Sequence, residues 1–197
     1  MIRPPRTHPT RQLAPKTRPP ACGSGASCGR KENFEMTSYA IYEGPEGPLL
    51  IAVDEDGRVV RLHFVDGPLP ITDDWHQDAD ALKPVSRQLD EYFAGERTEF
   101  DLELAPEGTP FQLDVWHQLT RIPYGETISY GELAKRVDRP GAARAVGAAN
   151  GRNPIAIIVP CHRVIGADGS LTGFGGGIPW KRWLLNREQP QGTLLSG

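Results

Sequence analysis

Residues 153–164 read Asn-Pro-Ile-Ala-Ile-Ile-Val-Pro-Cys-His-Arg-Val, and this stretch decides how the rest of the chain is interpreted. The apolar run Ile155–Val159 predicts a buried β-strand, because a short apolar run bounded by turn residues is typical of a strand covered on both faces. Pro160 follows the run, and Cys161 and His162 come directly after it. The sequence therefore predicts a thiol and an imidazole at the end of a buried strand.

Cys161 has two interpretations on residue chemistry alone. A free cysteine has a pKa of about 8.5 and is mostly protonated near neutral pH, so a nucleophilic role needs a base or a positive charge close by. His162 is adjacent, but neighbours on an extended chain point to opposite sides, which favours a proton relay through a bent backbone or a water over direct contact. Cys161 is therefore either an activated nucleophile or a buried structural cysteine.

Two short helices are predicted before this stretch. Ser129-Tyr130-Gly131-Glu132 has the capping-box pattern, with Ser at the N-cap and Glu three residues later. The helix Tyr130–Val137 is closed by Asp138-Arg139-Pro140-Gly141, and a second helix, Ala142–Ala149, follows. Such a pair matches a helix-turn-helix, although an ordinary helical hairpin has the same pattern.

The second of these helices has an unusual composition for a helix that reads DNA. An ordinary recognition helix presents several long polar side chains to the major groove, whereas Ala142–Ala149 presents Arg144 among methyl groups and glycine. Small side chains let a backbone approach a narrow minor groove closely, and Arg144 could then occupy the space that a base vacates. Tight packing in a core, with Arg144 in a salt bridge, explains the same residues equally well.

The first half of the chain has the pattern of a small antiparallel sheet. Three short runs of apolar and β-branched residues are separated by turn residues, and an apolar pattern at helical spacing then ends at Gly95. Residues 66–80 read as an acidic loop. No residue of this half suggests catalysis, so we expect it to support the other half. The expected strands are Ser38–Tyr42, Leu49–Asp54 and Val59–Phe64, and the expected helix is Val85–Phe93.

The sequence predicts an α+β fold. A small N-terminal three-stranded antiparallel sheet with a helix packs on a mainly helical C-terminal domain, which carries the helix-turn-helix and Cys161. A boundary at Ala105–Pro110 precedes one more expected helix, Phe111–Arg121. The expected units are a basic, proline-rich tail (1–35), an N-terminal α/β domain (36–105), a C-terminal domain (106–190) and a flexible tail (191–197).

Charge is unevenly distributed along the chain, although the net charge is only −3. Residues 1–35 hold seven basic and two acidic side chains, residues 36–106 hold five and 16, and residues 107–197 hold ten and seven. A polyanion is therefore expected to avoid the middle third and to prefer the last. No apolar run is long enough to cross a bilayer, so no membrane partner is expected.

The composition of residues 1–35 is typical of disorder, with six prolines and almost no large apolar side chains. Translation beginning at Met36 would explain it, and a basic arm that touches DNA is the alternative. The chain has three cysteines, too few for a disulfide framework, which fits a reducing cytoplasm. Cys22 and Cys28 lack the paired spacing of a zinc site, and no metal site is expected.

The C-terminal half resembles the O6-methylguanine–DNA methyltransferase family. The resemblance rests on Pro160-Cys161-His162-Arg163-Val164, preceded by Asn153-Pro154 and by Ala-Ala-Arg-Ala-Val-Gly at 142–147. It continues through Gly173-Phe174-Gly175-Gly176-Gly177 and Lys181–Glu188, in the family's order and spacing. Residues 109–188 match closely, whereas residues 37–105 resemble the family's ribonuclease-H-like N-terminal domain in outline only.

The resemblance implies roles for particular residues. Cys161 would be the nucleophile and alkyl acceptor, His162 would take its proton through a water, and Glu188 would orient that imidazole. Asn153 would tie the preceding segment to the reactive turn, and Tyr130 would donate a proton or a hydrogen bond to the leaving guanine. The implied DNA-binding residues are Arg144, which fills the stack after base flipping, Ala143, Tyr130 and Arg152, and the implied base pocket consists of Val164, Phe174 and Gly175 beside Cys161.

The resemblance also implies the reaction and the partner. One displacement would move the alkyl group of O6-alkylguanine, and of O4-alkylthymine, to Cys161 and leave a thioether. Because a thioether has no easy leaving route, turnover stops at one, and no cofactor is needed. The partner would be double-stranded DNA, bound through its minor groove with the damaged base flipped out, and the protein would act as a monomer.

Departures from the family pattern concern the adduct pocket. Phe174 stands where some members have Tyr, which keeps an apolar wall but removes a hydroxyl, and Gly175 stands where others have Ser. Both changes would alter which adducts fit without abolishing the reaction. Ile178-Pro179-Trp180 is also atypical, and the sequence suggests no role for it.

Three other classes of protein fit parts of the sequence. A Cys-His protease would need a histidine from elsewhere in the chain, and His63, His76 and His117 lie in no motif that suggests one. An alkyltransferase-like damage-recognition protein would lack the cysteine that this chain has. A transcription regulator would use the helix-turn-helix, but no regulatory domain is recognisable.

Overall fold

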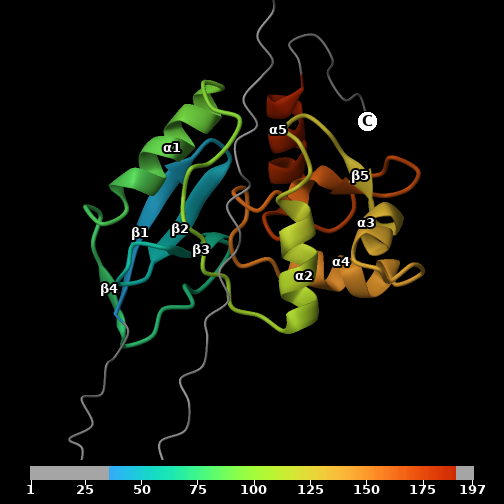
Figure 1. Ribbon diagram of the computed structural model, residues 1–197. Coiled ribbons are helices and arrows are strands. Elements are labelled where there is room, and N and C mark those ends of the chain that lie inside the picture. Colours follow the sequence, from blue (N-terminus) through green and yellow to red (C-terminus); the bar gives the residue numbers. More distant parts are fainter. Residues whose placement is uncertain (1–35, 190–197) are drawn as a thin grey trace, which may run out of the picture.

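The computed structural model describes residues 36–189, which form two halves lying side by side (Figure 1). One half is a sheet with a single helix against it, and the other contains four helices and a two-stranded sheet. The predictions for residues 1–35, which include Cys22 and Cys28, and for residues 191–197 lie outside the described part. No helix within residues 36–189 is long and apolar enough to span a bilayer.

The N-terminal sheet contains the three expected antiparallel strands and one more. Strands β1 (Thr37–Gly44), β2 (Gly47–Val53) and β3 (Val59–Phe64) pair in sequence order. β4 (Trp75–Gln77) pairs in parallel with the outer edge of β1, so the strand order is β3-β2-β1-β4. The prediction of a loop over residues 66–80 misses β4, because three residues are too few for an alternating pattern to be recognised.

Helix α1 (Lys83–Ala94) follows the sheet and ends at Gly95, as expected. Gly95 has a φ of 81°, the left-handed conformation that terminates helices at little cost only for glycine. The helix runs beside the sheet at the edge of the N-terminal half (Figure 1). Its buried side is formed by Val85, Gln88, Leu89 and Tyr92.

The C-terminal half begins with α2 (Pro110–Leu119), which starts with a complete capping box between Thr109 and Gln112. The box that the sequence predicts at Ser129 is only half formed. The Ser129 hydroxyl accepts a hydrogen bond from the main-chain nitrogen of Glu132 at 3.1 Å, but the Glu132 carboxylate pairs with Lys135 instead of capping the helix. The remaining helices are α3 (Tyr130–Arg136), α4 (Ala143–Gly151) and α5 (Gly177–Glu188), and β5 (Ile128–Ser129) pairs in parallel with β6 (Val164–Ile165).

The prediction of a strand over Ile155–Val159 is wrong. Residue 155 makes an isolated bridge to Leu62 of β3, and the following residues form turns, with the Val159 nitrogen donating to the Ile155 carbonyl at 3.0 Å. Ile157 has a φ of 70°, which no regular strand contains. The run is apolar because every residue in it is buried, and burial without extension produces the same sequence pattern.

Aromatic contacts join the two halves around Phe64, at the end of β3. Its ring centroid lies 5.1 Å from that of Phe174 and 5.1 Å from that of Trp180. A side chain at Gly176 would place its Cβ 2.6 Å from the same ring, so glycine is required for this close approach. Trp180, to which the sequence assigns no role, thus forms part of the contact between the halves.

We expect Phe64→Ala to lower the free energy of unfolding by about 3–4 kcal/mol, because Phe64 is only 3% exposed and its removal leaves a cavity between the halves. Urea denaturation followed by tryptophan fluorescence measures the change. Ile41→Ala is the control, since Ile41 is 38% exposed and should change stability by less than about 0.5 kcal/mol. Equal effects would show that the aromatic contact does not hold the halves together.

Candidate active site around Cys161

Cys161 begins a single turn of 3₁₀ helix, Cys161–Arg163, and the turn is fixed by two asparagines. Asn153 donates to the carbonyl of Val159 at 2.8 Å, and Asn150 donates to the carbonyl of Cys161 at 3.3 Å. Both amides are buried, so the main-chain groups they satisfy would otherwise lack partners. A tight turn therefore presents the thiol, and the backbone at Cys161 and His162 is bent, not extended.

The Cys161 thiol is a free cysteine that is 5% exposed. Burial raises its pKa, while a hydrogen bond from Asn153 and the positive charge of Lys181 lower it and offset part of the increase. A buried thiol in this setting is mostly protonated near neutral pH. Nucleophilic attack by Cys161 therefore needs a base to remove the proton.

His162 is the titratable base next to the thiol along the chain, and it is completely buried. Its Nε2 lies 2.9 Å from Oε1 of Glu188. A carboxylate can only accept a hydrogen bond, so Nε2 carries the hydrogen and Nδ1 keeps its lone pair. Within the described residues Nδ1 has no hydrogen-bond partner. Burial lowers the pKa of His162, and the hydrogen bond and charge of Glu188 act in the opposite direction.

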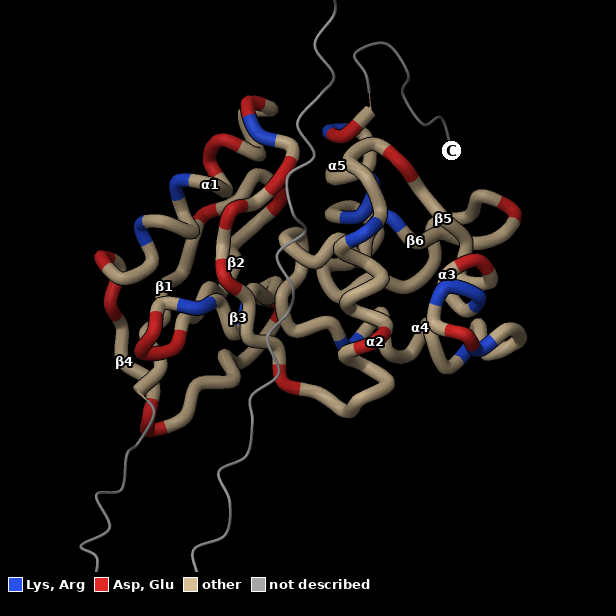
Figure 2. Tube along the Cα trace, viewed as in Figure 1, with Lys and Arg blue, Asp and Glu red and all other residues tan. Residues whose placement is uncertain are grey.

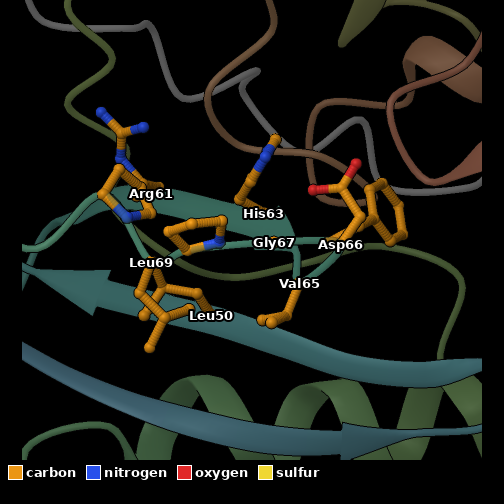
Figure 3. Close-up of a pocket in the computed structure, with 10 residues that line it drawn as sticks. Leu50, Arg61, His63, Val65, Asp66, Gly67 and Leu69 are labelled. Carbon is orange, nitrogen blue, oxygen red and sulfur yellow. The ribbon is translucent and has the colours of Figure 1, made fainter.

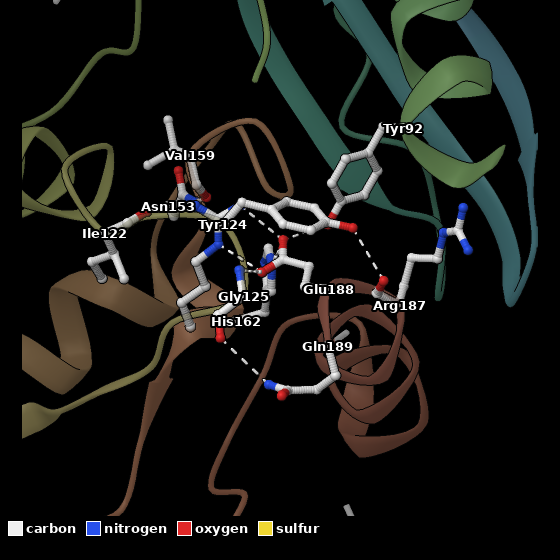
Figure 4. A network of polar contacts seen from close by, with 11 residues as sticks. Tyr92, Ile122, Tyr124, Gly125, Asn153, Val159, His162, Arg187, Glu188 and Gln189 are labelled. Carbon is white, nitrogen blue, oxygen red and sulfur yellow. Dashed lines mark hydrogen bonds and ion pairs between the residues drawn. The ribbon is translucent and has the colours of Figure 1, made fainter. Parts of the chain in front are cut away.

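Glu188 is the centre of a buried network that Figure 4 shows. Besides His162, its carboxylate accepts two hydrogen bonds from Arg163, each 2.8 Å long. It also accepts one from the Tyr92 hydroxyl at 2.7 Å and one from the Gly125 main-chain nitrogen at 3.3 Å. Burial alone would raise the pKa of Glu188, but His162 and Arg163 outweigh burial and hold that pKa well below its usual range. Glu188 is therefore an anion at neutral pH.

Lys181 is a second buried cation close to the thiol. Its ammonium donates to the carbonyls of Val164 at 2.7 Å and Thr172 at 3.0 Å, and burial lowers its pKa to about 8. It also lies 5.9 Å from the centroid of the Tyr130 ring. The Tyr130 hydroxyl accepts a hydrogen bond from Thr172 at 3.3 Å, which leaves its own hydrogen free to be donated.

The residues expected to contact DNA lie on the surface of α4 and at its end. Arg144 is exposed near the start of the helix, Ala143 is half-buried beside it, and Arg152 is exposed at the C-cap. Within residues 36–189, the hydrogen bonds and ion pairs of the network around Cys161 do not include Arg144. Figure 2 shows acidic residues over much of the N-terminal half and basic residues along α3, α4 and α5, in keeping with the charge of the corresponding segments.

The three expected base-pocket residues differ in their exposure. Val164 is buried, Phe174 is half-buried, and Gly175 is exposed. Phe174 rests on Phe64, and a Cβ on Gly175 would lie 4.0 Å from the same ring. Phe174 and Gly175 therefore lie at the contact between the halves, and Val164 directly follows the turn at Cys161.

The sequence did not reveal several residues that lie around Cys161 and Glu188. Arg163 and Lys181 belong to the segments that carry the resemblance, yet neither is given a role, because a long cation is ordinarily expected at the surface. Tyr92 comes from the half in which no catalytic residue was expected. Gly125 stands out in the sequence because it belongs to the segment that ends α2, but nothing in the sequence indicates its contact with Glu188. Only the fold brings these residues together.

A separate cavity lies along β3 of the sheet (Figure 3). It has a volume of about 210 Å³ and is lined by β3 and the loop that follows, including Arg61, His63 and Asp66. Burial lowers the pKa of His63 there. None of the residues expected to react lines this cavity. No group of three or more His, Cys, Asp or Glu side chains within residues 36–189 is placed to hold a metal ion.

Comparisons with known proteins cover both halves. Residues 37–106 match the family model of the 6-O-methylguanine DNA methyltransferase ribonuclease-like domain, and residues 110–190 match that of its DNA-binding domain. The methylated-DNA–protein-cysteine methyltransferase of Methanosarcina acetivorans is 54% identical over 152 residues, which are 76% of this chain and 97% of the relative. That of Mycobacterium tuberculosis is 53% identical over 155 residues, which are 78% and 93% of the two chains.

Solved structures give the same likeness. A crystal structure of Mycobacterium tuberculosis O6-methylguanine methyltransferase superimposes with a TM-score of 0.74 at 53% identity, covering 78% of this chain and 93% of the other. A crystal structure of Mycobacterium tuberculosis OGT in complex with DNA gives a TM-score of 0.73 at 53% identity, covering 77% and 92%.

We expect Glu188→Gln to lower the free energy of unfolding by about 3 kcal/mol near neutral pH, because the Arg163 guanidinium stays buried without its counter-charge. Since the pKa of Glu188 is depressed in the folded state, its stabilising contribution is complete near neutral pH. That contribution is lost progressively as the pH falls below about 4.3. The variant should lack this part of the acid dependence. Urea denaturation of both proteins from pH 7 to about pH 3.5 measures both effects.

Glu132→Gln is the matched control for this substitution. The Glu132 carboxylate lies 3.5 Å from Lys135 and is 45% exposed, so the same change should cost less than about 0.5 kcal/mol. Losses of similar size in the two variants would contradict the interpretation of Glu188 as a buried, multiply bonded anion.

Proposed function

Because the chain belongs to the 6-O-methylguanine DNA methyltransferase family, we propose that it repairs alkylated DNA by direct reversal. In this reaction the alkyl group of O6-alkylguanine is transferred irreversibly to Cys161. The observation that carries the choice of Cys161 is its position beside the buried His162–Glu188 pair, 2.9 Å between Nε2 and Oε1. That pair can take a proton from the thiol and stabilise the charge that results.

Proton removal is the first step. The thiol proton passes to Nδ1 of His162, through a bridging water as the family resemblance implies, and the thiolate remains on Cys161. The imidazolium is stabilised by the carboxylate of Glu188, which stays ionised because Arg163 also pairs with it. The buried ammonium of Lys181 favours the thiolate in addition, because its positive charge lowers the pKa of Cys161.

Displacement at carbon is the second step. A lone pair of the Cys161 sulfur forms a bond to the alkyl carbon, the bond from that carbon to O6 breaks, and its electron pair passes to the guanine. Tyr130 supports the leaving group by donating a hydrogen bond or its proton. Its hydroxyl hydrogen is available for this, because Thr172 is the donor in the bond between the two side chains.

The product is a thioether on Cys161 and an unmodified guanine. No group of the site can reverse the carbon–sulfur bond, so each protein reacts once. The displacement needs neither an electron donor nor a metal, and all proton transfers can be performed by Cys161, His162 and Tyr130. The same geometry would accept O4-alkylthymine, in which the alkyl carbon is also bonded to an exocyclic oxygen of the base.

DNA would be bound through the C-terminal half. The small residues of α4, Ala143 included, allow the helix to enter the minor groove closely. Arg144, exposed beside them, would fill the stack once the damaged base has turned out, and Arg152 would contact the backbone. Val164, Phe174 and Gly175 would line the pocket that receives the base. The protein would act as a monomer.

We expect Cys161→Ser to abolish methyl transfer while leaving DNA binding nearly intact, because the serine hydroxyl is not appreciably ionised near neutral pH. The measurement is mass spectrometry of the protein after incubation with a duplex that contains O6-methylguanine. The wild type should gain one methyl group on Cys161.

A variant with both Cys22→Ser and Cys28→Ser is the matched control, and it should gain the methyl group as the wild type does. A methyl group found on Cys22 or Cys28, or stoichiometric demethylation by Cys161→Ser, would refute the assignment of the acceptor.

We expect Arg144→Ala to slow repair of duplex DNA by roughly tenfold or more and to leave the reaction with free O6-methylguanine base nearly unchanged, because the free base needs no flipping. Single-turnover rates on both substrates provide the measurement. Arg139→Ala, which also removes an exposed charge, from the turn before α4, should weaken DNA binding without slowing the reaction of the bound complex. Equal losses on duplex and free base would place Arg144 in the structure of the protein instead.

A further inference from the structure

One hydrogen bond joins the N-terminal half to the reactive network. The Tyr92 hydroxyl, at the end of α1, donates to Oε1 of Glu188 at 2.7 Å, and Tyr92 is fully buried. Its ring packs against Phe100, with ring centroids 5.3 Å apart, and edge-on against Tyr124 at 6.2 Å. A phenylalanine ring would make the same packing contacts. The hydroxyl is therefore the feature that packing does not explain.

We propose that Tyr92 is a positioning residue for the alkyl transfer, through which the N-terminal half sets how strongly Glu188 attracts a proton onto His162. The inference rests on the proposed function, because His162 matters here as the base that takes the thiol proton. It extends that function to a residue in the half that does not carry the reactive motif.

Three donors share one oxygen atom of Glu188. Oε1 of Glu188 accepts from the Tyr92 hydroxyl at 2.7 Å, from Arg163 at 2.8 Å and from His162 at 2.9 Å. Each donor neutralises part of the negative charge that the others experience. Removal of the neutral Tyr92 donor leaves more negative charge facing His162. The imidazolium is then favoured, and the pKa of His162 rises.

Other charged groups near His162 also change its pKa. Glu188 favours the protonated ring, whereas the positive charges of Arg163 and Lys181 oppose it. Tyr92 stays a neutral donor at all accessible pH values, since burial and the adjacent Glu188 raise its pKa well above the ordinary range. The titratable and charged groups around the His162–Glu188 pair are Cys161 and Arg163 on the same turn as His162, Lys181 on α5, Tyr92 on α1 and Tyr124 after α2.

Tyr92 therefore extends the pH range in which the protein reacts toward acidic pH. A resting His162 must be neutral to accept the proton of Cys161. Because Tyr92 donates to the Glu188 carboxylate, it limits the rise in the pKa of His162 that Glu188 causes, so the ring stays neutral in the resting protein. The same carboxylate still stabilises the imidazolium formed during transfer. The N-terminal half thus contributes to the chemistry without touching the alkyl group.

The test is a pH–rate profile of methyl transfer by the full chain and by Tyr92→Phe on one oligonucleotide, at saturating protein. Tyr124→Phe is the matched control. Its hydroxyl belongs to the same group of rings, but it donates to the Arg187 carbonyl at 3.1 Å and not to the carboxylate. In Tyr92→Phe the acid limb should move to higher pH, so that the ratio of the rates at about pH 8 and about pH 6 rises roughly threefold. The wild type and Tyr124→Phe should give superimposable profiles.

A second measurement does not depend on the reaction. Nitrogen NMR of His162 in the unreacted proteins, assigned by its loss in His162→Gln, should show its protonation at higher pH in Tyr92→Phe than in the other two. If the wild type transfers the methyl group but Tyr92→Phe shows neither a shifted pH–rate profile nor shifted His162 signals, the role of Tyr92 is overturned. Equal shifts in Tyr124→Phe would overturn it as well. Absence of transfer by the wild type would instead overturn the proposed function.

Discussion

A carboxylate buried away from water is the constraint on which this structure depends. An ionised group in the protein interior is stable only when opposite charges and hydrogen-bond donors surround it. Glu188 is 2% exposed and meets this requirement with five hydrogen bonds. The donors come from the end of α1, from the turn after α2 and from the 3₁₀ turn at Cys161, while Glu188 itself ends α5. Four distant segments of the chain must therefore converge on one side chain before its charge is compensated, and this convergence places His162, the residue after Cys161, against the carboxylate.

The turn at Gly125 illustrates how local conformation serves this site. Gly125 has a φ of 78°, which is accessible to glycine without strain, and a Cβ there would lie 2.9 Å from the main-chain oxygen of Glu188. Both the backbone conformation and the space exclude a side chain. The main-chain nitrogen can then reach the carboxylate, and Tyr124 can bond to the neighbouring Arg187 carbonyl. A residue that the sequence shows only as a helix breaker is thus part of the wall of the network.

Both halves contribute residues to the site, although their charges differ. The N-terminal half has the larger share of acidic residues, which opposes contact with DNA, and α3 and α4 lie entirely in the C-terminal half. Yet Phe64 of β3 supports Phe174 and Trp180, and Tyr92 of α1 bonds to Glu188. The N-terminal sheet and helix therefore hold the segment that follows the turn at Cys161 and complete the set of donors around the Glu188 carboxylate. Packing and electrostatics act together at this boundary.

The sequence by itself determined what depends on local pattern: three antiparallel strands, the helix that ends at Gly95, the two short helices before the Cys161 segment, and the motif that contains Cys161 and His162. These features follow from turn residues, periodicity and a resemblance carried by contiguous residues. Only the tertiary structure decided that residues 156–159 form turns, that β4 joins the sheet, and that Arg163, Lys181 and Tyr92 surround the site. An apolar run reports burial and not backbone conformation, and a hydrogen bond between residues 96 positions apart leaves no local pattern. The physical reason is that the buried charge of Glu188 requires donors that lie close to it in space, and those donors can come from any part of the chain.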